Sequence, residues 1–136
     1  MISEIYAIGR GNESAFLIVE GGEIVHYGSH KWSETIDFEG ISAPSIDDNC
    51  EVIAIICALI MCQNNHRQLV NIYTENDDTH HRYDLLLLDS PFMDSFVRHS
   101  SGMDICAEKW QEQFYDKAGW KENRFKNRCL ELLDNN

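Results

Sequence analysis

Basic side chains are scarce in this sequence, and their scarcity limits what the protein can bind. Eleven lysines and arginines stand against 23 aspartates and glutamates, which gives a formal net charge of −12 at pH 7. A surface of that sign repels phosphates and disfavours nucleic-acid binding driven by counterion release. We therefore expect no nucleic-acid partner. The acid excess either keeps the protein soluble or faces a basic surface on another protein.

Long apolar runs and paired cysteine motifs are also missing. The longest apolar run, Val52 to Cys62, is too short to span a bilayer. Met1 to Glu4 show no basic region followed by an apolar stretch, so we expect no signal peptide. The five cysteines form no CxxC pair, and their odd number favours free thiols in a reducing, cytoplasmic compartment. Together these absences predict a globular cytoplasmic protein without a membrane contact.

Familiar catalytic and nucleotide-binding motifs are absent as well. Gly9-Arg10-Gly11 lacks the third glycine and the parallel-strand context of a phosphate-binding loop, so we interpret it as a turn. No serine, histidine and aspartate occur in the order of a hydrolase triad. The adjacent pair His80 and His81 would point to opposite sides of a strand, which makes it a poor site for a transition metal.

The most informative stretch that is present runs from Asn49 to Asp78. Val52 to Cys62 contains no glycine or proline, and its length suits a helix better than a strand. We predict a helix from Asn49 to Gln63, capped by Asp47, Asp48 or Asn49 and enclosed by the fold because no face of it favours water. Leu69 to Thr74 alternates like a strand and is followed at once by four polar residues, Glu75, Asn76, Asp77 and Asp78.

Three strands are expected before this helix. They run from Ile2 to Ile8, from Ala15 to Glu20 and from Glu23 to Tyr27. The turns between them, at residues 9–12 and at Gly21-Gly22, are too short for a crossover, so the strands should form an antiparallel meander. Residues 28–48 are polar and mixed, and we expect no strand there.

Weaker patterns follow Asp78. Leu85 to Leu88 suits either a buried strand or part of a helix, and Phe92 to His99 suits a short helix. Asp104 to Ala118 has apolar residues near helical spacing, and Glu122 to Leu133 reads as a last amphipathic helix. No linker divides the chain, so we expect residues 1–136 to form a single domain.

Four stretches together resemble ribonuclease H. The family has a first strand ending in a metal-binding aspartate and a glycine, a helix with an early glutamate and later alanines, a strand ending in Thr-Asp-Ser, and a last helix with an aspartate after a cysteine. The matching stretches are Ile5-Tyr6-Ala7-Ile8-Gly9, Asn49-Cys50-Glu51 with Ala54 and Ala58-Leu59, Ile72-Tyr73-Thr74-Glu75, and Asn127-Arg128-Cys129. The resemblance implies an α/β fold with a ribonuclease H-like mixed sheet, built from a β-meander, a crossover helix and a further strand, with C-terminal helices.

The resemblance also implies where a catalytic site would lie. Members of the family cut the RNA strand of hybrids with two divalent ions held by four acids. In this sequence those four positions are Ile8, Glu51, Glu75 and Leu130. Glu51 and Glu75 are thus the candidate catalytic residues, and they form the candidate Mg²⁺ or Mn²⁺ ligands together with Asp77 and Asp78. Each also has a simpler interpretation, because an acid suits the first turn of a helix and acidic loops are commonly just solvated.

Two functions follow from this pattern. The first is a non-catalytic scaffold that contacts an unknown protein partner and needs no cofactor, because Ile8 and Leu130 cannot ligate a metal. The second is a divergent Mg²⁺- or Mn²⁺-dependent nuclease acting on RNA, RNA–DNA hybrids or DNA, for which Glu51 and Glu75 remain. Whether the protein is an enzyme is left open by the sequence.

Overall fold

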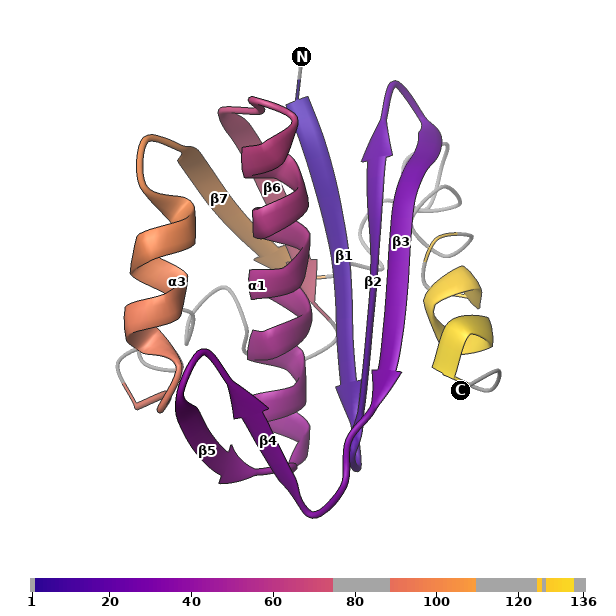
Figure 1. The fold of residues 1–136 in the computed structure, drawn as a ribbon. Coiled ribbons are helices and arrows are strands. Elements are labelled where there is room, and N and C mark those ends of the chain that lie inside the picture. Colours follow the sequence, from indigo (N-terminus) through magenta and orange to yellow (C-terminus); the bar gives the residue numbers. More distant parts are fainter. Residues whose placement is uncertain (1, 75–88, 110–124, 126, 134–136) are drawn as a thin grey trace.

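The computed structural model describes residues 2–74, 89–109, 125 and 127–133. Figure 1 shows the elements in the order β1 (Ile2–Arg10), β2 (Glu13–Glu20), β3 (Glu23–Lys31), β4 (Thr35–Phe38), β5 (Ile41–Pro44), α1 (Asp47–Asn64), β6 (Leu69–Thr74), α3 (Met93–Ser100) and β7 (Asp104–Lys109). Residues 127–133 form a further helical stretch, which we call the C-terminal helix.

Five strands form one mixed sheet in the order β3-β2-β1-β6-β7. The pairs β1–β2 and β2–β3 are antiparallel, as the meander predicted, and Gly21 and Gly22 take the positive φ angles of 61° and 83° that a tight hairpin needs. β6 lies parallel to β1, with Ile5 opposite Ile72 and Ala7 opposite Thr74. The predicted strand at Leu69 to Thr74 is therefore confirmed, and the structure places it beside β1.

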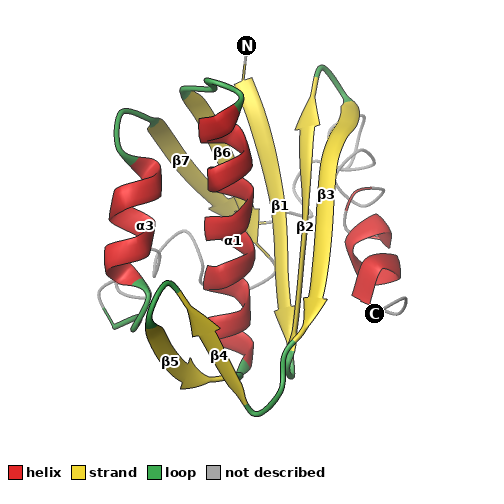
Figure 2. Ribbon diagram, in the orientation of Figure 1, coloured by secondary structure: helices red, strands yellow, loops and turns green. Residues whose placement is uncertain are grey.

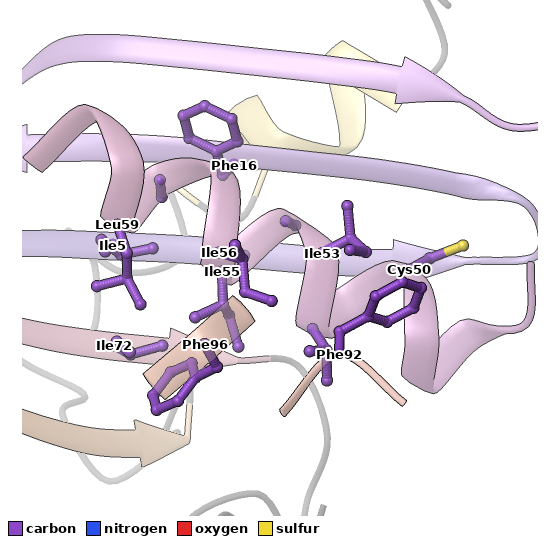
Figure 3. Packing of buried hydrophobic residues seen from close by; sticks show 14 of the residues in the cluster. Ile5, Phe16, Cys50, Ile53, Ile55, Ile56, Leu59, Ile72, Phe92 and Phe96 are labelled. Carbon is purple, nitrogen blue, oxygen red and sulfur yellow. The ribbon is translucent and has the colours of Figure 1, made fainter. Parts of the chain in front are cut away.

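Helices cover both faces of this sheet, which gives three layers (Figures 1 and 2). α1 and α3 pack on one face, and the apolar side chains between them and the sheet form the inner cluster seen in Figure 3. The C-terminal helix packs on the other face. Its apolar residues and those of the sheet form what we call the C-terminal cluster, made of Tyr6, Ile8, Ala15, Leu17, Val19, Tyr73, Phe125, Cys129, Leu132 and Leu133.

α1 is enclosed, as its apolar sequence predicted. Eleven of its 18 residues are buried, and Ile53, Ile55, Ile56 and Leu59 are fully so. The predicted cap is wrong, however: the residue before the helix is Ile46, and no side chain caps it. The Asp47 carboxylate instead accepts a hydrogen bond of 2.6 Å from the backbone N–H of Gly11, so its charge is used to hold the turn after β1.

Three other expectations need correction. Gly9 and Arg10 belong to β1 rather than to a turn. The stretch 28–48 is not free of strands, because β3 extends to Lys31 and β4 and β5 form a small hairpin whose Ile36 side chain is fully buried. Asp104 does not begin a helix; residues 104–109 form β7, parallel to β6. Pairing with an open sheet edge outweighed the local helical pattern there.

The remaining expectations fall into two groups. The short helix predicted at Phe92 to His99 is confirmed as α3, and Phe125, Cys129, Leu132 and Leu133 lie on one buried side of the C-terminal end, as predicted. Leu85 to Leu88 and residues 110–118 lie outside the described residues. No helix among those that are described is both long and apolar enough to cross a membrane.

Candidate functional site

The candidate site lies where the C-terminal ends of β1 and β6 meet the first turn of α1. Glu51 is in this turn, and only 7% of its surface is exposed. β1 reaches the turn at Gly9, where a Cβ atom would lie 2.2 Å from the backbone N of Glu51 and 2.5 Å from the backbone O of Asp47. The absence of a side chain at Gly9 therefore lets strand and helix touch, and it sets the backbone of Glu51 against the end of β1.

Thr74 ends β6 beside this point. It pairs with Ala7 of β1, two residues before Gly9. Because it comes two residues after Ile72, which packs in the inner cluster, Thr74 faces α1 as well. Thr74 is fully buried, and its Oγ1 makes no hydrogen bond to the part of the chain that the structure describes. A buried hydroxyl and a buried carboxyl group thus lie at the ends of the two central parallel strands, on the α1 face of the sheet.

Hydrogen bonds from the meander hold the first turn of α1 in place. The Ser14 hydroxyl of β2 donates to the backbone O of Cys50 at 2.7 Å and accepts from the indole Nε1 of Trp32 at 3.0 Å. The side-chain amide of Asn49 donates to the backbone O of Pro44 at 2.8 Å. Because these partners come from β2, β5 and the segment after β3, the position of Glu51 depends on all of them.

Ile8 and Leu130 lie on the other face of the sheet. Ile8 is completely buried in the C-terminal cluster, and Leu130 packs against the same cluster. Cys129, next to Leu130, is also fully buried, and its thiol donates to the backbone O of Tyr6 at 3.5 Å. The resemblance assigns both positions to metal-binding acids. In this structure both hold aliphatic side chains, and both side chains pack in or against the same apolar cluster.

The described residues alone do not fit a metal ion. Within residues 2–74, 89–109, 125 and 127–133, no group of three or more histidine, cysteine, aspartate or glutamate side chains could hold one. The predicted ligands Glu75, Asp77 and Asp78, and the pair His80 and His81, lie outside the described residues. Of the four predicted site residues, the structure thus places Glu51, and it places Thr74 immediately before Glu75.

Carboxylates with lowered pKa lie away from this edge. Hydrogen bonds from Arg67, at 2.5 and 3.1 Å, lower the pKa of Glu20 despite its burial. Burial alone would raise the pKa of Glu39, but hydrogen bonds from His99 and Ser95 and the charges of His99 and Arg98 lower it. Both acids join separate elements, so they serve the fold rather than the candidate site.

The cysteine thiols of α1 are poor nucleophiles. Burial raises the pKa of Cys57 and of Cys62 to about 11, so both stay protonated at neutral pH. Burial also raises the pKa of Cys50, whose thiol donates to the backbone O of Gly11 at 3.4 Å. All five cysteines are free. The thiols of Cys50, Cys57 and Cys62 pack as apolar groups in or against the inner cluster.

The sequence does not reveal the structural roles of Gly9 and Thr74 at this site. Gly9 was assigned to a turn, although a glycine directly after an apolar strand is also a signal for close backbone approach. Thr74 was taken only as the end of a strand. Its complete burial follows from pairing with β1 and cover by α1, and no local pattern reports either contact.

Comparison with known proteins gives the fold a context. No protein-family model and no curated protein matches the sequence. Among solved structures, the chain is similar to RNase H1 from the halophilic archaeon Halobacterium salinarum NRC-1, with a TM-score of 0.60, 17% identity and 100% of both chains covered. It is also similar to LC11-RNase H1, solved in complex with an RNA/DNA hybrid, with a TM-score of 0.60, 14% identity, and 98% of this chain and 96% of that chain covered. The chain thus has a ribonuclease H-like fold.

Proposed function

We propose that this ribonuclease H-like domain is non-catalytic and acts through contacts with other proteins. The observation that carries the proposal is the burial of Ile8 in the C-terminal cluster, against which the partly buried Leu130 also packs. In the family that the sequence resembles, both positions hold acids that bind divalent ions. An aliphatic side chain supplies no ligand and leaves a metal ion poorly solvated.

The charge balance of the remaining acids supports the same conclusion. Two divalent ions a few ångströms apart repel each other strongly unless carboxylates lie between and around them. By the resemblance, Ile8 takes the sequence position of the carboxylate that bridges both ions, and its side chain is completely buried. Glu51 and Glu75 would supply two negative charges against the four positive charges of two divalent ions. The charge of the second ion would therefore not be offset.

The net charge of −12 supports a protein rather than a nucleic acid as the partner. Nucleic-acid binding rests largely on lysine and arginine contacts to phosphates, and this chain has 11 such residues against 23 acids. A fold can persist after its chemistry is lost, because function resides in sites placed on a fold.

One observation favours the divergent nuclease as a second candidate. Glu51 is buried at the ends of β1 and β6, and Glu75 directly follows the buried Thr74. These two acids, with Asp77 and Asp78, would hold one Mg²⁺ or Mn²⁺ ion, whose role would be to polarise a phosphate and activate a water molecule.

Cleavage of a labelled RNA–DNA hybrid in Mn²⁺ or Mg²⁺ separates the two candidates. We expect the parent protein to show no cleavage above background, because too few ligands remain to hold two ions. Glu51→Gln removes the retained acid, and Glu34→Gln removes an exposed acid as a matched control. Cleavage by the parent and by Glu34→Gln, but not by Glu51→Gln, would contradict the proposal that the domain is non-catalytic.

Restoring the missing acids tests the same proposal from the other side. Ile8→Asp with Leu130→Asp returns a carboxylate to each position. We expect the double variant to bind Mn²⁺ more tightly than the parent in calorimetry, even if it does not cleave the hybrid. Since Ile8 is buried, circular dichroism must first show that the double variant is folded. Mn²⁺ binding by the parent as tight as by the folded double variant would contradict the loss of a metal site.

A further inference from the structure

A cavity of about 160 Å³ lies between β3 and α1, on the face of the sheet that α1 covers. Small residues leave this space where the two elements pass each other: Gly28 on β3, and Ala54 and Cys57 on one side of α1. Gly28 stands opposite Phe16 of β2, and a Cβ atom at Gly28 would lie 2.7 Å from the Phe16 ring. β3 therefore sends no side chain toward α1 at this point, and the Phe16 ring lies directly against its backbone.

Both buried and exposed residues line the cavity. Its inner part is formed by Phe16 of β2 and by Ile53 and Ala54 of α1, which are buried members of the inner cluster; Figure 3 shows Phe16 and Ile53. Its outer part includes His30 of β3, which is exposed, and Trp32, which is half-buried. A molecule can thus enter from solvent and reach side chains of the core.

The inner polar groups of the cavity offer little to a water molecule. The Ser14 hydroxyl donates to the backbone O of Cys50 and accepts from the indole Nε1 of Trp32, so its proton is already used. Burial keeps the Cys57 thiol protonated by raising its pKa to about 11, and no aspartate, glutamate, lysine or arginine is among the described residues of the lining. A water molecule that is poorly held is displaced favourably by an apolar group. The cavity therefore favours a neutral, apolar occupant.

Three rings border the space and favour a planar occupant. They belong to Phe16, His30 and Trp32. The rings of His30 and Trp32 already meet edge to face, with centroids 4.2 Å apart and an interplanar angle of 61°. Aromatic rings prefer such edge-to-face contacts, or offset stacking, with a further ring. A flat ring can make these contacts, whereas a puckered aliphatic ring of the same size cannot.

The volume sets the size of the occupant. An apolar cavity of about 150 Å³ inside a protein takes up benzene, and the cavity between β3 and α1 has about 160 Å³. We propose that this cavity binds one neutral, planar, apolar ring of about the size of benzene, supplied by a free small molecule or carried on a larger one. This binding goes beyond the proposed function and does not depend on it, since the cavity is built from β2, β3 and α1 without Glu51, Ile8 or Leu130.

Titration of the full chain with benzene, followed in amide NMR spectra, tests the proposal. The backbone signal of Gly28 and the indole signal of Trp32 should shift and saturate, while the signals of β7 stay in place. Cys57→Leu fills part of the cavity and should raise the Kd by about tenfold or more, as should Ala54→Leu, a second filling variant. Cys106→Leu makes the same change as Cys57→Leu at an exposed position of β7 and should leave the Kd within about twofold of the parent value. Circular dichroism of every variant confirms that the chain is folded.

A comparison of phenol with cyclohexanol tests the preference for a planar ring. The two molecules carry the same hydroxyl group on rings of similar size, and phenol, the planar one, should bind at least about threefold more tightly. N-acetylphenylalanine amide separates the two sources of the ring: saturable shifts at Gly28 and Trp32 assign the site to rings carried on a peptide as well, and their absence assigns it to free molecules. Benzene without a saturable shift at Gly28 and Trp32, a Kd unchanged in the folded filling variants, or cyclohexanol binding as tightly as phenol would each overturn the proposal.

Discussion

Gly9→Ala adds a single methyl group, and we expect it to be among the most destabilising of such additions in this protein. The new Cβ would lie 2.2 Å from the backbone N of Glu51, 2.5 Å from the backbone O of Asp47 and 2.7 Å from the backbone C of Cys50. All three contacts are with backbone of the first turn of α1, which has no rotamer to change. The turn must therefore move by about 1 Å, in a core that is packed to native density.

The cost follows from what moves with that turn. α1 buries eleven residues against the sheet, so displacing its start disturbs the inner cluster and the Ser14 hydrogen bond to Cys50. Overpacking of this kind costs about 3 kcal/mol. For a chain of this size, with a urea dependence of about 1.5 kcal/mol per molar, the unfolding midpoint should fall by about 2 M.

Gly28→Ala is the matched control. Its Cβ would lie 2.7 Å from the ring of Phe16, which is a side chain beside the cavity of about 160 Å³ and can move into it. We expect a loss of about 1 kcal/mol or less for this variant. Urea unfolding followed by circular dichroism measures both. If Gly9→Ala unfolds within about 0.5 M of the parent, or no earlier than Gly28→Ala, then α1 does not rest against the backbone of β1 as described.

Two further predictions concern the enclosed helix and a half-buried ion pair. Leu59→Asp places a charge in the inner cluster, where Leu59 is 0% exposed, and should abolish cooperative thermal unfolding at a cost of several kcal/mol, whereas Val97→Asp on the exposed side of α3 should change the melting temperature little. Because Arg67 lowers the pKa of Glu20 in the folded state, the stabilisation from this carboxylate is present above its usual pKa near 4.5 and is lost as the pH falls through the lowered value. The stability advantage of the parent over Glu20→Gln should therefore hold at pH 7 and shrink below pH 4.5; urea titrations showing an advantage that grows with acidity would contradict it.

Local chemistry accounts for the elements that the sequence predicted correctly. The length of the unbroken apolar run in α1 favours an enclosed helix, and two adjacent glycines between alternating strands favour a tight hairpin. The ribonuclease H-like order of strands and helix follows from these two features and from the alternation at Leu69 to Thr74. The lack of an acid at Ile8 was readable from the sequence alone, since no fold turns an isoleucine into a ligand.

Tertiary structure decided the rest, because the deciding contacts join residues far apart in the chain. Asp104 to Lys109 has a pattern that suits a helix or a strand, and only the open side of β6 makes it β7. Likewise, Gly9 is a close contact rather than a turn because α1 reaches it. The sequence shows that Ile8 and Leu130 each replace an acid that the resemblance expects. Only the fold shows that the two side chains pack in or against the same C-terminal cluster. Amino-acid patterns determine which segments can be buried, and the pairing of those segments determines which side chains share a site.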